Sequence, residues 1–171
     1  MTKSRETRLK VGASPDRVLR ALTSEAFLIE RDRVQGAISV VVEEVSRSDE
    51  RLVQKVTATQ HTRGLTGIDT SKTEEAVTIF SWNLGKRHAD WTYRGPHDDR
   101  VTVRGTIDVQ PDGDGAFIDE TFTIEVRVPL MGRKIESVVI DQMTKGFPAY
   151  ERVVRHHLRG PSRPDEECPS P

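Results

Sequence analysis

Six polar side chains interrupt the apolar pattern of this sequence and are the residues that could do chemistry. They are Gln54, Gln60, Glu120, Glu136, Gln142 and His157. A carboxyl group in an apolar pocket has a raised pKa and can serve as an acid or a base, and a histidine can do the same. Glu120, Glu136 and His157 are therefore the candidates for acid–base catalysis.

Three explanations compete for these polar positions: partners inside the protein, an irregular register, or a cavity that holds water and a ligand. An unpaired buried polar group costs about 1–3 kcal/mol, so pairing or misregister is the simpler explanation for any one residue. Together they favour an apolar cavity with a few polar anchors, the usual composition of a small-molecule site. The predicted ligand-binding residues are Gln54, Val56, Trp91, Tyr93, Glu120, Phe122, Glu136, Val139, Met143, Phe147 and Tyr150.

Two other stretches could suggest a metal site. The sequence "DGDG" from Asp112 to Gly115 lacks the ligand series and the terminal glutamate of a calcium loop, so we predict a hairpin turn there. His156 and His157 are adjacent in a predicted helix, where successive side chains point about 100° apart. We expect that they do not bind one ion together, and we predict no metal site and no cofactor.

Nucleophilic chemistry has little support. His88 and Asp90 lie on one face of a predicted strand, opposite Trp91 and Tyr93, which favours a solvent-exposed pair. The single cysteine, Cys168, lies in a proline-rich stretch where nothing would hold a base beside it. No nucleophile, base and orienting group occur at a recognisable spacing, so we predict no catalytic residue.

The length and composition of the chain indicate which class of protein it belongs to. The chain has 171 residues, of which 35% are hydrophobic and 31% charged, as expected for one domain with a real core. We place that domain at residues 1–160 and predict a disordered tail at 161–171, where prolines replace large apolar residues. No apolar run approaches the roughly 18 residues of a membrane span, and no signal peptide is evident.

The charge of the chain and its cysteine content limit which kinds of partner and which cellular location we expect. The net charge is −1 with acids and bases interspersed, which argues against a nucleic-acid surface. A single cysteine cannot form an internal disulfide, so a reducing cytoplasm is the expected location. The sequence does not indicate an oligomeric state.

The elements that must position these residues begin with a strand and two short helices. Residues 6–11 alternate apolar and charged side chains, as in a half-buried strand. Ser14 and Pro15 suit the start of a helix, and a second short helix through residues 24–34 ends at Gly36.

Residues 37–129 read almost entirely as strands, each with one apolar and one polar face, which predicts antiparallel pairing. A long helix with a broad apolar stripe follows from Met131 to Leu158. Because each strand has one apolar face, the sheet must curl around that helix. The predicted fold is therefore α+β, with a curved antiparallel sheet of about six to seven strands wrapped around a C-terminal helix.

Two stretches resemble a known superfamily. "ASPDRVLRALTSEAFLIER" resembles the opening of START/Bet v 1-like (SRPBCC) proteins, and "VRVPLMGRKIESVVIDQMTKGF" resembles their bacterial DUF2505 branch. The resemblance covers residues 5–159 and implies the helix-grip fold, in which the sheet and the C-terminal helix enclose a cavity. Members bind lipids, sterols, polyketides and other apolar molecules, and some are cyclases or hydrolases. The DUF2505 branch supplies no catalytic residue to transfer.

The long helix contains "KGFP" in its middle. Pro148 has no N–H, so the carbonyl of Thr144 loses its helical partner. Since the apolar stripe continues in phase beyond it, we predict one helix, kinked near Gly146–Pro148. Such a kink either lets the helix follow the curved sheet or forms a hinge at which Phe147 gates the cavity.

The preferred functional hypothesis is non-catalytic binding of an apolar or amphipathic small molecule, lipid or polyketide-like, between the sheet and the C-terminal helix. One alternative is a cyclase or hydrolase that uses a cavity carboxylate or histidine. Another is a protein-interaction module whose cavity is filled by side chains.

Overall fold

The computed structural model describes residues 2–64, 67–96, 100–130 and 132–159. These residues form seven strands and three helices in the predicted order. The elements are β1 (Thr2–Val11), α1 (Pro15–Leu22), α2 (Glu25–Val34), β2 (Ala37–Arg47), β3 (Arg51–Gly64), β4 (Gly67–Asn83), β5 (His88–Arg94), β6 (Val101–Asp112), β7 (Gly115–Val126) and α3 (Gly132–Leu158). The predicted tail, residues 161–171, lies outside the described residues.

Local sequence signals account for most element ends. Pro15 occupies the start of α1, although the side chain of Ser14 makes no capping hydrogen bond. Ser24 caps α2, because its hydroxyl accepts a hydrogen bond from the backbone N–H of Phe27 at 3.3 Å. Gly36, with a φ of 101°, follows α2, in the left-handed region that favours glycine.

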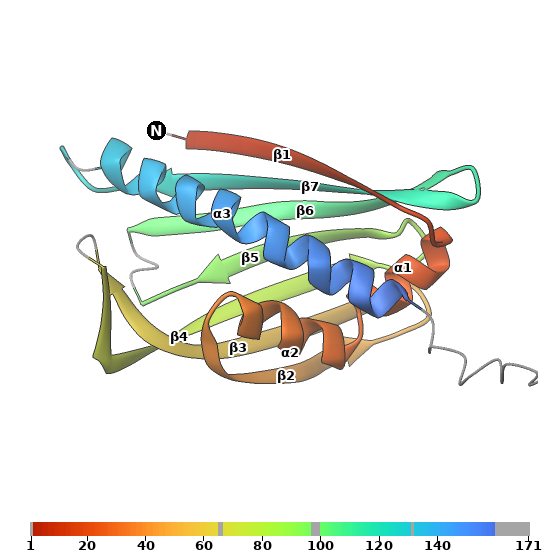
Figure 1. The fold of residues 1–171 in the computed structure, drawn as a ribbon, viewed down its shortest axis with the longest axis horizontal. Coiled ribbons are helices and arrows are strands. Elements are labelled where there is room, and N and C mark those ends of the chain that lie inside the picture. Colours follow the sequence, from red (N-terminus) through yellow and green to blue (C-terminus); the bar gives the residue numbers. More distant parts are fainter. Residues whose placement is uncertain (1, 65–66, 97–99, 131, 160–171) are drawn as a thin grey trace, which may run out of the picture.

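The strands form one antiparallel sheet in the order β1-β7-β6-β5-β4-β3-β2. From β2 to β7 the strands follow one another as a meander, and β1 closes one edge by pairing with β7. The predicted turn between β6 and β7 is confirmed, with Gly113 at a φ of 56°. All three helices lie on one face of the sheet, and α3 crosses it obliquely (Figure 1). The helix-grip prediction is confirmed.

Two apolar clusters fill the space between the sheet and the helices. The larger cluster joins α1, α2 and the C-terminal half of α3 to the sheet through residues such as Val18, Phe27 and Val154. The smaller cluster lies under the N-terminal half of α3 and centres on Val103 and Ile124. No helix among the described residues is long and apolar enough to cross a membrane.

Candidate functional site

A cavity of about 420 Å³ lies between the inner face of the sheet and the helices α2 and α3. Its volume falls in the range of roughly 300–1,000 Å³ that small-molecule sites occupy. The helices contribute Phe27, Leu28 and Arg31 from α2, and Met143, Phe147 and Tyr150 from α3.

The alternation of strand residues explains the sheet side of the cavity. Successive side chains point to opposite faces, so residues two apart share a face. The inner face therefore receives Ala58 and Gln60 from β3, Ala76, Thr78, Phe80 and Trp82 from β4, Trp91 and Tyr93 from β5, and Glu120 and Phe122 from β7. The small alanines leave room that aromatic rings at the other positions enclose.

A hydrogen-bonded pair forms the polar part of the cavity. The hydroxyl of Tyr150 on α3 donates to the carboxylate of Glu120 on β7. Burial is the largest influence on Glu120 and raises its pKa, while the Tyr150 hydrogen bond and the charge of Arg31 lower it by less. Burial, followed by the charge and the hydrogen bond of Glu120, raises the pKa of Tyr150 well above its usual value. The phenol therefore stays protonated, and the carboxyl group can hold a proton more readily than an exposed glutamate.

Arg31 brings a positive charge to the same cavity. Its Nε and Nη2 atoms lie 2.7 and 2.6 Å from Oδ1 of Asp32. Its Cζ atom lies 4.8 Å from the centroid of the Phe80 ring, a cation–π distance. The guanidinium group is thus fixed against the wall, within electrostatic reach of Glu120.

Trp82 provides a buried donor at the cavity wall. Its side chain is 2% exposed, and its Nε1–H has no hydrogen-bond partner among the described residues. Burying an unpaired donor is costly, so a water molecule or an acceptor on a ligand would stabilise this position.

Seven of the eleven predicted ligand-binding residues line the cavity: Trp91, Tyr93, Glu120, Phe122, Met143, Phe147 and Tyr150. The prediction that these residues bind a ligand stays a prediction. The other four residues lie elsewhere.

The four exceptions have physical explanations. Gln54 lies where the end of α1 covers the sheet, and its Nε2 donates to the carbonyl of Thr23 at 2.9 Å. Val56 is completely buried in the larger apolar cluster. Val139 packs against the smaller cluster, and Glu136 lines a separate pocket of about 240 Å³ below the start of α3.

Sequence reasoning missed the contribution of α2. Arg31 is absent from the predicted ligand-binding residues, although its spacing of four from Phe27 places both on one face of a helix. Phe80 and Trp82 follow the same alternation as Trp91 and could have been predicted from it. Of the three acid–base candidates, Glu120 lines the cavity, whereas Glu136 and His157 do not.

The helix α3 runs unbroken through "KGFP", as predicted. Gly146 contacts α2: its carbonyl accepts a hydrogen bond from Nε2 of Gln35 at 3.0 Å, and a Cβ atom there would lie 2.4 Å from Oε1 of Gln35. Phe147 and Pro148 both line the cavity. Whether a kink at this point acts as a hinge stays a prediction.

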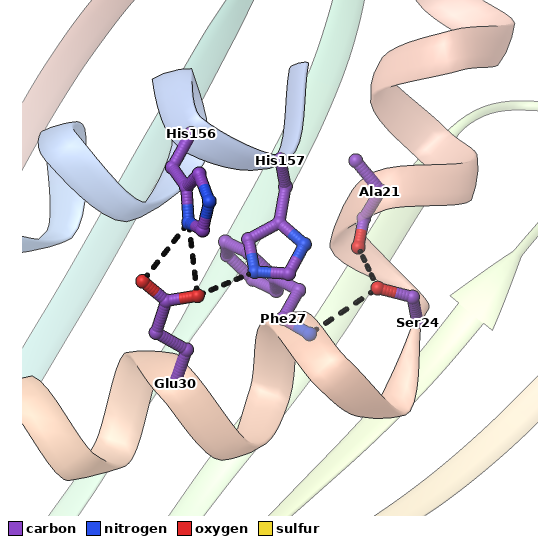
Figure 2. A network of polar contacts seen from close by, with 6 residues as sticks. All are labelled: Ala21, Ser24, Phe27, Glu30, His156 and His157. Atoms are coloured by element: carbon purple, nitrogen blue, oxygen red, sulfur yellow. Dashed lines mark hydrogen bonds and ion pairs between the residues drawn. The ribbon is translucent and has the colours of Figure 1, made fainter. Parts of the chain in front are cut away.

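The expectation that His156 and His157 point apart is wrong, because both side chains reach the carboxylate of Glu30. Nδ1 of His156 lies 3.1 Å from both carboxylate oxygens of Glu30, and Nε2 of His157 lies 2.8 Å from one of them (Figure 2). Neighbouring helical side chains converge here because the two rings use different nitrogens, and their centroids are 5.2 Å apart. His88 lies nearer to Asp108, with Nδ1 2.7 Å from Oδ1, than to the predicted partner Asp90, whose Oδ2 is 3.7 Å from Nε2.

Comparison with known proteins agrees with this architecture. The family described as "Protein of unknown function (DUF2505)" matches residues 6–158. The chain belongs to the DUF2505 family. No curated protein matches it.

Solved structures with the same fold show low sequence identity to this DUF2505 chain. The Zhui aromatase/cyclase from Streptomyces sp. R1128 is 13% identical, with 94% of this chain and 98% of that chain covered and a TM-score of 0.62. Norcoclaurine synthase from Thalictrum flavum, solved in complex with dopamine and hydroxybenzaldehyde, is 15% identical, with 94% and 90% covered and a TM-score of 0.61. Ara h 8.0201 is 15% identical, with 91% and 99% covered and a TM-score of 0.59. These likenesses establish the Bet v 1-like (SRPBCC) fold.

Proposed function

We propose that this DUF2505 protein binds an apolar or amphipathic small molecule, lipid or polyketide-like, in the cavity between the sheet and α3. The observation that carries the proposal is a cavity of about 420 Å³ with mostly apolar walls and a few polar groups. A protein-interaction module with a filled interior is disfavoured by the same cavity. The single cysteine supports a cytoplasmic setting.

The walls indicate the chemical character of the ligand. Phe80, Trp91 and Phe122 offer aromatic surfaces, against which a ring system or an acyl chain would lose its contact with water. Glu120 and Tyr150 form a hydrogen-bonded pair that could receive one hydroxyl or carbonyl group. The proposed ligand is therefore a largely hydrophobic molecule with one polar end.

Displacement of an environment-sensitive apolar dye tests this proposal. Wild-type protein should bind the dye in a saturable manner, and fatty acids or aromatic polyketides should displace it. Ala58→Trp places a large ring on the inner face of β3 and should abolish saturable binding, because Ala58 is 9% exposed and lines the cavity.

Thr57→Trp is the matched control, because residue 57 points to the opposite face of the same strand. It should bind the dye like wild type. Equal dye binding by Ala58→Trp and Thr57→Trp would contradict the proposal, provided that both variants are folded by circular dichroism.

A second candidate function is cyclase-type catalysis, favoured by the Glu120–Tyr150 pair in an apolar cavity. Burial raises the pKa of Glu120, which suits a group that transfers protons near neutral pH. Glu120→Gln should then abolish turnover of an incubated metabolite mixture, while Glu6→Gln, on the exposed surface of β1, should retain it. Identical products from wild type and Glu120→Gln would eliminate catalysis through this carboxylate.

A further inference from the structure

Three potential metal ligands converge where α2 meets the last turn of α3. Glu30, His156 and His157 each offer one ligand atom, and these three atoms lie within 4.8 Å of one another. The two imidazole–carboxylate distances are 3.1 and 2.8 Å. Figure 2 shows both rings directed at the same carboxylate from the opposite helix. This cluster lies apart from the lining of the cavity.

Packing holds two of the three ligands in place. The ring of His157 meets the ring of Phe27 edge to face, with centroids 5.6 Å apart and an angle of 88°. Phe27 precedes Glu30 by three residues on α2, so both lie on one face of that helix. The side chain of His157 is 17% exposed, whereas that of His156 is 68% exposed. His157 and Glu30 are therefore preorganised, and His156 is free to adjust.

The donor set fits a zinc-class ion. Two imidazole nitrogens and one carboxylate oxygen suit zinc and its neighbours, while calcium and magnesium prefer oxygen ligands alone. Tetrahedral zinc with bonds of about 2.0–2.1 Å places its ligand atoms roughly 3.3 Å apart, close to the separations of 2.8 and 3.1 Å seen here. Three protein ligands with a fourth position open to water is a known zinc arrangement.

Without a metal ion, the two rings and the carboxylate form an ordinary hydrogen-bonded cluster between α2 and α3.

We propose that Glu30, His156 and His157 bind a zinc-class divalent transition metal ion that clamps α2 to the C-terminal end of α3. Both helices form walls of the cavity, through residues such as Leu28 on α2 and Phe147 on α3. Phe27 contacts both His157 and Tyr150, so the clamp would fix the cavity wall through that ring. The metal site does not depend on the proposed ligand-binding function.

Calorimetric titration of the full chain with Zn²⁺ after chelator treatment tests the site. Cys168→Ser serves as the parent protein, because it removes the one thiol in the sequence. The parent should bind one Zn²⁺ per chain, and its melting temperature should rise with zinc concentration, because the ion binds the folded state.

The ligand variants make the test specific. His156→Gln with His157→Gln should weaken binding by more than the roughly 10–100-fold typical for loss of an outer-shell partner, and zinc should no longer raise the melting temperature. His61→Gln with His88→Gln removes the same number of imidazoles elsewhere and should behave like the parent.

Glu30→Gln keeps the shape and one hydrogen-bond acceptor of Glu30. If the double-histidine variant does not fold, this variant replaces it in the test. It too should weaken zinc binding. No saturable zinc binding by the parent, unchanged affinity in the ligand variants, or equal loss in the His61/His88 control would overturn the proposal. Zinc binding without a rise in melting temperature would overturn the clamp.

Discussion

The two halves of α3 meet the same sheet in different ways. Its N-terminal half lies on the smaller apolar cluster, in which Ile124 of β7 is completely buried. Its C-terminal half lies partly over the cavity, where Ile107 of β6 is 7% exposed and forms part of the wall. Two neighbouring strands thus each supply an isoleucine, one to a packed region and the other to the wall of the cavity. The difference shows that this sheet gives up packing contacts where α2 and α3 leave space between them.

Two glutamates, Glu120 and Glu136, repeat that contrast. Glu120 lines the cavity of about 420 Å³ and accepts a hydrogen bond from Tyr150. Glu136 is completely buried under the start of α3, beside a pocket of about 240 Å³ shared with Val126 and Arg133. The larger space has aromatic walls and is the proposed ligand site, whereas the smaller one is formed by a few residues at a helix start.

The largest expected effect is a difference in stability between two identical truncations. Ile124→Ala should lower the free energy of unfolding by about 4 kcal/mol and Ile107→Ala by about 2 kcal/mol, the upper and lower parts of the range for such changes. Ile124 loses contacts on every side, whereas Ile107 already faces open space. Urea unfolding measures both. Equal losses would mean that the cavity is closed in solution.

A smaller effect concerns the pH dependence of stability. Since burial raises the pKa of Glu120 in the folded protein, its contribution to stability is complete below the ordinary pKa of a glutamate and is lost as the pH rises through the raised value. Glu120→Gln should therefore stabilise the protein at pH 8 relative to wild type, and less at pH 5. Urea unfolding at the two pH values provides the measurement. A constant difference across that interval would show that the carboxyl group titrates normally.

The smallest expected effect is at Gly146. Gly146→Ala gains up to about 1 kcal/mol of helix propensity but displaces Gln35, whose Oε1 would lie 2.4 Å from the new Cβ atom. Gln35 then loses its hydrogen bond to the Gly146 carbonyl, and the two effects should nearly cancel. Adding Gln35→Ala should raise the melting temperature above that of Gly146→Ala alone. A further decrease would show that Gln35 supports the helix independently of this contact.

Pro148 keeps the gate hypothesis testable. Gly146→Ala combined with Pro148→Ala should melt at or above the wild-type temperature, since both changes favour a regular helix. If the helix must bend to admit a ligand, stopped-flow dye uptake by this variant should be slower. Unchanged uptake together with a much lower melting temperature would mean that these residues serve packing alone.

The sequence predicted the fold well because its strands alternate cleanly. The pattern of Ala89, Trp91 and Tyr93, for example, assigns the inner face of β5 without any tertiary information. Gln54 shows the limit of that reasoning, since its parity is inward but the end of α1 covers it. The alternation along a strand predicts toward which face of the sheet a side chain points, but not which element covers that face.

For the same reason, the sequence could not predict which side chains from different elements meet in the folded protein. Arg31 looks like any surface arginine until α2 is placed over Phe80. Likewise, the angle between adjacent helical side chains predicted that His156 and His157 point apart, whereas the reach of the two rings to Glu30 depends on how α2 packs against α3.

Native mass spectrometry of protein purified from its natural host tests the central claim most directly, because it weighs what the cavity holds. Wild type should carry a small molecule that organic solvent extracts, and Ala58→Trp purified in the same way should have the mass of the chain alone. A wild-type mass equal to that of the bare chain, with no dye displaced by fatty acids or aromatic polyketides, would contradict the claim that this cavity binds such a ligand.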